Sequence, residues 1–399
     1  MIIQSPAPVS KLYRLLEDGR FFVVALMLAF AGRMMLSALG HNYDFESWDI
    51  VAKLMKDGKN VYAGTHRYNY SPFWMWMLYL LKMIFASHFR TALAAFISLF
   101  DVGIAILFFR NSKVVAAYLL LLSPISIIIS GYHNQFDNIA ILFALAAAFY
   151  IERKPCYECD VKGWSLTMKQ TLLVAFLLGL SLVIKHVFIF FPIWLLLHKR
   201  LTISQKAILI VVPYTLFALS FLPYWHEGKE GIVANILLYE PTINAPAYNL
   251  FIGKPILDMI TLYSASPFRN IFFMLLMLSG FFLRKRPLLE MLAFYCLLIV
   301  LLSSNLFVHY FLIPVFFFAI FESRLWLVYN VVGLIFLISH PHEFNYRNIS
   351  SGNAQVVATF FADFGFYMLV FILLLALIDV CWPALLHRKT IVSWLKPYL

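Results

Sequence analysis

Long runs of apolar residues recur along the chain and are separated by short polar clusters. The first run covers 21–39, and similar runs continue to Cys381. Most approach the ~20 residues that a helix needs to cross the hydrocarbon core of a bilayer. The pattern predicts an all-α, polytopic membrane protein in which residues 1–399 form a single membrane-embedded domain. The first run is too long for a signal-peptide core and lacks a small-residue cleavage site, so we expect it to be retained as a helix.

The later apolar runs predict spans at about 91–109, 114–130, 136–151, 171–184, 186–197, 206–224, 270–283, 289–303, 306–321, 325–340 and 357–381. With the first helix they make roughly 12 crossings, within a range of about 11 to 13. The segment 71–86 is short, contains Lys82 and is rich in tryptophan and methionine. We therefore expect it to lie at the outer interface or to re-enter the membrane, and we do not count it as a crossing.

The charged residues around the first helix indicate its orientation. Lys11, Arg14 and Arg20 precede it, and an acidic stretch, YDFESWD, follows it. Cytoplasmic connections are enriched in lysine and arginine, so both termini are predicted to be cytoplasmic. Three basic clusters in later connections then also face the cytoplasm: HKR at 198–200, RKR at 284–286 and HRK at 387–389. Counting 71–86 as a crossing would turn these clusters outward.

The composition supports a membrane environment, since 62% of residues are hydrophobic and only 13% are charged. The formal net charge of +11 does not favour nucleic-acid binding, because the basic residues lie in short patches between apolar runs instead of on one face. Cys156 and Cys159 form a C-x-x-C pair, which is found in redox sites and zinc sites. No second pair completes a metal site, so incidental thiols are the favoured interpretation.

This path gathers the polar, aromatic and histidine-rich segments on the external side. Asp44 and Glu46 directly follow the first helix, near the surface where a lipid-linked substrate presents its head group. Two carboxylates at this spacing suit a general base with a supporting acid or a metal ligand. The alternative is a solvated acidic loop without a chemical role.

Arg33 lies inside the predicted first helix, about two turns before its external end. A charge within a bilayer is costly, so this side chain should face protein and find an anionic partner. We expect that partner to be Asp44 or Glu46, or else a phosphate of the substrate.

GYHNQFDN at 131–138 places His133, Gln135 and Asp137 at an external junction between two helices, where Gly131 permits a sharp break. Such groups can bind a hydroxyl-rich sugar. A polar turn between helices is the simpler alternative.

Lys185 and His186 interrupt one apolar run, and His309 interrupts another, each near the predicted outer surface. Cationic and hydrogen-bonding groups at these places can hold a phosphate. Structural hydrogen bonding within the membrane is an equally good explanation for each of them.

Together these segments resemble the GT-C superfamily of membrane glycosyltransferases, which use polyprenyl-phosphate sugars. YDFES followed by RYNYSPFWMWM is similar to that family's catalytic loop and the tyrosine-proline element that opens its next helix, with Tyr70-Ser71-Pro72 in place of Tyr-Pro-Pro. SGYHNQFDNI, IKHVFIFFP and NLFVHY are similar to elements of the dolichyl-phosphate-glucose glucosyltransferases. In the last element this chain has Tyr310 where the family has glutamate.

The resemblance implies that Asp44 is the catalytic base and that Lys185, His186 and His309 lie near the donor phosphate. It implies an inverting transfer of mannose or glucose from a polyprenyl phosphate to a glycan or glycolipid acceptor, in a bacterial plasma membrane or the endoplasmic reticulum. One base is chemically sufficient, because a phosphodiester leaving group departs as a stable anion. No cofactor is expected. The D-x-E of Asp44 and Glu46 is a poor metal cage, so no metal is expected either.

Two other functions remain open from the sequence. A transporter or flippase of lipid-linked saccharides would also need many spans and intramembrane charges, although no repeat between the two halves is evident. A ligase or polymerase of lipid-linked glycans would favour a large external loop rich in arginine and histidine. The external segment 225–269 contains few firm cations: Lys229, Lys254 and Arg269.

Overall fold

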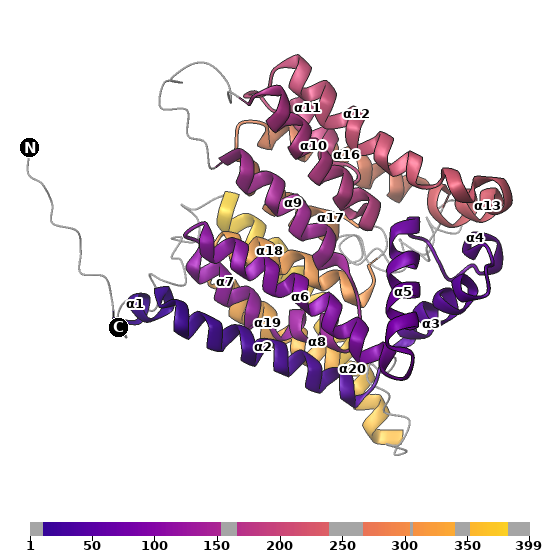
Figure 1. The fold of residues 1–399 in the computed structure, drawn as a ribbon. Coiled ribbons are helices and arrows are strands. Elements are labelled where there is room, and N and C mark those ends of the chain that lie inside the picture. Colours follow the sequence, from indigo (N-terminus) through magenta and orange to yellow (C-terminus); the bar gives the residue numbers. More distant parts are fainter. Residues whose placement is uncertain (1–10, 153–165, 239–265, 304–305, 340–351, 382–399) are drawn as a thin grey trace, which may run out of the picture.

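The computed structural model describes residues 11–152, 166–238, 266–303, 306–339 and 352–381. This part of the chain is built from helices and short connections (Figure 1), which confirms the predicted all-helical class. The Cys156–Cys159 pair, most of the 225–269 segment and the basic cluster at 387–389 lie outside the described residues.

Helices occupy the positions of the predicted spans, within a few residues at each end. They are α2 (Gly19–Leu39), α6 (Phe89–Arg110), α7 (Val114–Leu121), α8 (Pro124–Gly131), α9 (Asp137–Glu152), α10 (Met168–Ile184), η2 (His186–Phe188), α11 (Phe191–Leu197), α12 (Ile203–Ser220), α16 (Ser266–Leu283), α17 (Leu288–Leu301), η5 (Val308–Leu312), α18 (Ile313–Ile320), α19 (Leu325–Ser339) and α20 (Gly352–Cys381). Shorter elements complete the described chain: α1 (Lys11–Glu17), α3 (Tyr43–Lys56), α4 (Val61–Gly64), α5 (Pro72–Ile84), η1 (Ala86–His88), η3 (Leu222–Tyr224), α13 (Trp225–Ile232) and η4 (Val233–Leu237).

Several helices are long and apolar enough to cross a membrane, which supports a multi-pass membrane protein. Within the described residues four helical stretches meet this test, and two bent helix pairs raise the number to six. One pair is α7 with α8, bent by 54°, and the other is α10 with the η2–α11 segment, bent by 119°. The predicted separate span at 186–197 is therefore a turn followed by a helix of seven residues. That helix is about 10 Å long and cannot cross a bilayer alone.

The described connections gather at two opposite ends of the helix bundle. At one end, which we call the basic end, the Lys199 N–H donates to the Arg284 carbonyl (3.1 Å) and His198 Nε2 contacts the Arg286 carbonyl at 3.1 Å. The other end, which we call the site end, carries α3, α4, α5 and α13 (right in Figure 1). Two of the basic clusters thus share one end, as the predicted path requires.

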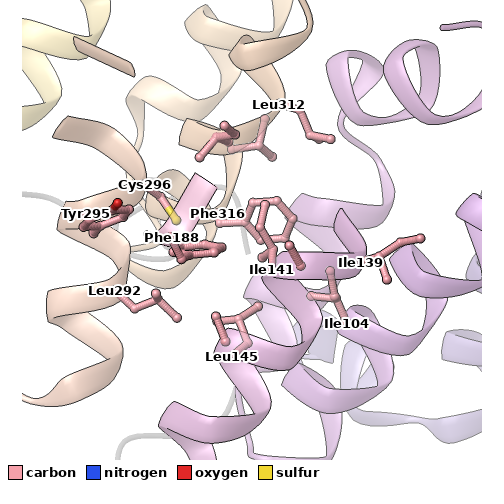
Figure 2. Packing of buried hydrophobic residues seen from close by; sticks show 14 of the residues in the cluster. Ile104, Ile139, Ile141, Leu145, Phe188, Leu292, Tyr295, Cys296, Leu312 and Phe316 are labelled. Carbon is pink, nitrogen blue, oxygen red and sulfur yellow. The ribbon is translucent and has the colours of Figure 1, made fainter. Parts of the chain in front are cut away.

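The centre of the bundle is a dense apolar core between α9, α17 and α18 (Figure 2). Ile141, Leu145, Leu292 and Phe316 are each at most 1% exposed there, and Phe188 stacks against Tyr295 in the middle of α17. Close packing of this kind resists small displacements, so helices that lead into the site end are held on a rigid support.

The helices α3 and α5 form a separate layer at the site end. Pro72 stands at the first position of α5, where a missing N–H is tolerated. Lys82 on α5 donates to Asp49 on α3 at 2.5 Å. With 13 residues, α5 is too short to span a bilayer, which agrees with its predicted interfacial or re-entrant role.

Candidate active site

Asp44 lies at the start of a helix, so the predicted acidic loop is wrong. Asn42 caps α3: its side-chain oxygen accepts from the Asp44 N–H (3.1 Å), and its amide nitrogen donates to Asp44 Oδ2 (3.1 Å). The positive end of the helix dipole also stabilises a carboxylate in this first turn. Asn42 was missed by the sequence reasoning, although an asparagine just before an acidic turn is a common N-cap signal.

A chain of hydrogen bonds joins Asp44 to three other predicted site residues. Gln135 Nε2 donates to Asp44 Oδ2 at 2.7 Å, and Gln135 Oε1 accepts from Lys185 Nζ at 3.2 Å. Lys185 Nζ also donates to Asp137 Oδ2 at 2.6 Å. Both members of this ion pair are buried, with side-chain exposures of 4% and 0%. The Gln135 amide therefore connects a partly exposed carboxylate to a buried ion pair.

The connection between α8 and α9 folds inward to present Gln135. His133, Asn134 and Gln135 are fully buried. Asn134 has a φ of 55°, a left-handed conformation that asparagine tolerates better than most residues, and its amide contacts the Gly131 carbonyl at 3.3 Å. This turn directs the following glutamine toward α3.

Aromatic rings surround the Lys185 ammonium. Its Nζ lies 5.3 Å from the Tyr70 ring, 4.9 Å from the Phe136 ring and 6.0 Å from the Tyr310 ring. Cations are attracted to ring faces at such distances. Tyr70, a predicted site residue, thus lies at the cluster, and Tyr310 contributes a further ring face beside the ammonium.

The three predicted histidines reach the cluster from different elements. His309 Nδ1 is 3.9 Å from Asp44 Oδ2, and the His186 ring is 6.3 Å from the Tyr70 ring. Burial lowers the pKa of His133 to about 4, although the nearby Asp44 charge opposes the shift. His309 Nε2 and His186 Nδ1 are buried atoms with no hydrogen-bond partner among the described residues.

Glu46 does not join this cluster. Residues two apart on a helix point in nearly opposite directions, so Asp44 and Glu46 face different sides of α3. The Glu46 side chain is 54% exposed and lies 3.7 Å from Arg67. The prediction that Asp44 and Glu46 act together assumed that both lie in a loop, whereas both lie in the helix α3.

Arg33 has a different partner from those predicted. Its Nε atom is 3.2 Å from Asp101 Oδ2 on α6, and its Nη2 atom donates to Ser126 Oγ on α8 at 2.9 Å. Asp101 and Arg33 have side-chain exposures of 0% and 1%. The expectation that Arg33 pairs with Asp44, with Glu46 or with a substrate phosphate is replaced by this buried ion pair.

Among the described residues, no three histidine, cysteine, aspartate or glutamate side chains are grouped closely enough to hold a metal ion. The cluster instead offers one carboxylate that is open to solvent on one side, a buried lysine and several imidazoles. Such a set suits proton abstraction and the binding of a polar or anionic ligand.

Comparison of the chain with protein-family models, with curated proteins and with solved structures gives no match. The function of the cluster is therefore inferred from its chemistry.

Proposed function

We propose that the protein is an inverting, GT-C-like glycosyltransferase that moves a mannose or glucose residue from a polyprenyl phosphate to a hydroxyl of a glycan or glycolipid. The observation that carries the proposal is the hydrogen-bonded chain Asp44–Gln135–Lys185–Asp137, with His309 beside Asp44. Its members come from segments far apart in the sequence, and they meet at the end of the bundle. Such convergence is unusual for purely solvated loop residues.

Asp44 is the base in this mechanism. The acceptor hydroxyl gives its proton to the carboxylate while its oxygen forms a bond to the anomeric carbon of the sugar. The bond from that carbon to the phosphate oxygen breaks, and its electron pair leaves with the polyprenyl phosphate. A single displacement inverts the configuration, and no acid is needed for this leaving group.

Gln135 and Lys185 keep Asp44 in its working state. Lys185 donates to the amide oxygen of Gln135, which polarises the amide and strengthens the hydrogen bond that Gln135 Nε2 donates to Asp44 Oδ2. The carboxylate is thereby held in one orientation. In the proposed complex the Lys185 charge, together with His186 and His309, stabilises the departing phosphate.

The proposed setting is a membrane crossed many times, with the site end at the external or lumenal face and both chain termini in the cytoplasm. Asp44 follows directly from α2, so it lies near the membrane surface where a lipid-linked sugar presents its phosphate. The proposal leaves bacterial plasma membrane and endoplasmic reticulum as the two possible hosts.

The test is transfer by the purified protein from short-chain polyprenyl phosphates that carry mannose or glucose, with release of polyprenyl phosphate as the readout. Asp44→Asn keeps the size of the side chain and removes its basicity, so turnover should fall about 10²–10⁴-fold. Glu46→Gln is the matched control on the same helix and should stay within about two-fold of wild type, because Glu46 points to solvent.

Survival of turnover in Asp44→Asn would refute the role of this carboxylate. A folded wild-type protein that releases no polyprenyl phosphate from any donor would refute the transferase. Movement of intact lipid-linked saccharide across vesicles would then favour a flippase. The buried Arg33–Asp101 pair is compatible with that alternative, because intramembrane ion pairs are common in transporters.

A further inference from the structure

A line of buried polar side chains crosses four helices on the basic-end side of the candidate active site. We call Arg33, Asp101, Ser126, Ser123 and Asn330 the polar network; all are at most 2% exposed. Arg33 contacts Asp101 (3.2 Å) and Ser126 Oγ (2.9 Å). The Ser126 N–H donates to Ser123 Oγ (3.2 Å), and that hydroxyl donates to Asn330 Oδ1 (2.5 Å). The network therefore ties α2, α6, α8 and α19 together.

The two central helices of this network lead directly to the site. The chain that leaves α2 carries Asp44, and the chain that leaves α8 carries Gln135. The two helices touch through their backbones, since a Cβ atom added at Gly131 would lie 2.7 Å from the Arg33 carbonyl oxygen. Because only a few residues separate each helix from its site residue, we expect a change in the angle or separation of α2 and α8 to alter the contact between Asp44 and Gln135.

The direction of α8 is also set within the network. The α7–α8 pair bends by 54° just before Pro124, and Ser123 caps α8 through the Ser126 N–H. The same Ser123 hydroxyl bonds Asn330 on α19. A bent helix pair has no continuous backbone ladder across its break, so these side-chain bonds replace it in defining where α8 points.

Arg33 is fully engaged by protein groups. Besides Asp101 and Ser126, it donates through Nη1 to the Ala29 carbonyl at 3.0 Å. A buried ion pair adds little net stability compared with well-packed apolar residues, but it can fix one arrangement among several. Arg33 joins α2 to α8 through Ser126, so the ion pair is well placed to fix the relative position of these two helices.

We propose that the polar network is a positioning device for the reaction: it holds α2 and α8 at the separation that lets Gln135 bond Asp44. This inference rests on the proposed transferase function for its kinetic test. Arg33 and its partners act through Asp44 and Gln135, and they do not touch the donor.

Two buried serines on α8 provide a matched test. Ser126 accepts from Arg33, whereas the Ser130 hydroxyl, one turn later on the same helix, has no hydrogen-bond partner among the described residues. Ser126→Ala and Ser130→Ala remove the same hydroxyl from the same helix. They are assayed with short-chain polyprenyl phosphate mannose and glucose, and kcat and the donor KM are measured separately.

Ser126→Ala should lower kcat about ten-fold with the donor KM within about two-fold, since a misplacement near 1 Å can cost up to 10²-fold. Ser130→Ala should resemble wild type. An equal loss in both variants would show general packing and overturn the proposal. A raised donor KM at constant kcat would make the network a donor site, and wild-type kinetics in Ser126→Ala would also overturn it.

A second measurement needs no substrate and separates this inference from the proposed function. With the four native cysteines replaced by alanine, Asp44→Cys and Gln135→Cys are exposed to mild oxidation, and the yield of intramolecular disulfide crosslink between the two positions is determined. Adding Ser126→Ala should lower this yield several-fold, and adding Ser130→Ala should not. If wild type transfers no sugar, this yield alone decides, and an unchanged yield with Ser126→Ala overturns the positioning role.

Discussion

Lys185 and Asp137 form a buried ion pair whose two members contribute differently to the site. Asp137 Oδ1 has no hydrogen-bond partner among the described residues, while its other oxygen accepts from Lys185. Lys185 alone also contacts Gln135. Removal of the lysine therefore has two separate consequences, one for folding and one for the orientation of Gln135.

We expect Lys185→Met to destabilise the protein by about 3–5 kcal/mol, because it leaves the Asp137 carboxylate buried and uncompensated. The double variant Lys185→Met/Asp137→Leu should regain most of that stability, yet its turnover should stay far below wild type. Thermal unfolding in detergent and release of polyprenyl phosphate measure the two quantities. Recovery of both stability and turnover in the double variant would show that the Lys185–Asp137 pair has only a structural role.

At the scale of elements, α3 and α5 are joined by a carboxylate between two lysines. Asp49 accepts from Lys53 at 2.6 Å and from Lys82 at 2.5 Å. Burial raises the pKa of the Asp49 carboxyl, but the hydrogen bonds and the positive charges of the two lysines together outweigh burial and hold the pKa below its ordinary value of 3.8.

A carboxyl whose pKa is lowered by folding stabilises the folded state above its unfolded-state pKa and loses that contribution as the pH falls through the folded-state value. The docking of α5 on α3 should therefore weaken below about pH 3.8. The measurement is the loss in thermal midpoint between pH 5 and pH 3. Asp49→Asn, which cannot titrate here, should lose less than wild type over this interval, and equal losses would contradict the assignment.

The contact of α13 with α4 leaves no space for a side chain at Gly231. A Cβ atom there would lie 1.9 Å from the Tyr62 carbonyl oxygen. Tyr62 in turn donates through its hydroxyl to the Tyr70 carbonyl at 2.8 Å, so the contact also supports the ring beside Lys185.

Gly231→Ala should lower stability by about 1–3 kcal/mol through overpacking. The matched control is Gly32→Ala on α2, where a Cβ atom would meet nothing within 4 Å, and its midpoint should not fall. Both variants are compared by thermal unfolding in detergent. A Gly231→Ala protein with the thermal midpoint of wild type would mean that the packing of α13 against α4 does not require a glycine at this position.

Most helices could be predicted from the sequence, but two local features were missed for identifiable reasons. The apolar run at 114–130 was predicted as one span and still passes as one, but its 54° bend was missed, although Ser123-Pro124 inside the run is a typical helix start. The YDFES segment was interpreted as a loop because it is acidic and follows a span. Its cap at Asn42 and the lysines in its last turn were the signals of a helix.

At the scale of the whole molecule, the segments that meet at the site could be predicted from the sequence, but the individual ion-pair partners could not. Asp44, Gln135, Lys185 and His309 were all expected on one face, and they do meet. The partner of Arg33 was not predictable, since Asp101 lies within an apolar run and 68 residues away. Partner choice depends on which helices pack together, and the spacing along one chain does not specify that packing.

The arrangement of connections at two ends makes the orientation of the protein testable with two exposed positions. Lys59 follows α3 at the site end, and Arg200 follows α11 at the basic end. In a background without native cysteines, Lys59→Cys should react with a membrane-impermeant maleimide added to the external or lumenal side of sealed vesicles. Arg200→Cys should react only after permeabilisation, because the end with more lysine and arginine is expected to face the cytoplasm.

The opposite labelling pattern would place Asp44 on the cytoplasmic side and remove the expected access to externally displayed donors. Labelling of both positions from the same side would contradict the placement of the two ends on opposite sides of the membrane. Permeabilised vesicles provide the control for reactivity, since both cysteines are on exposed residues and should then be modified equally.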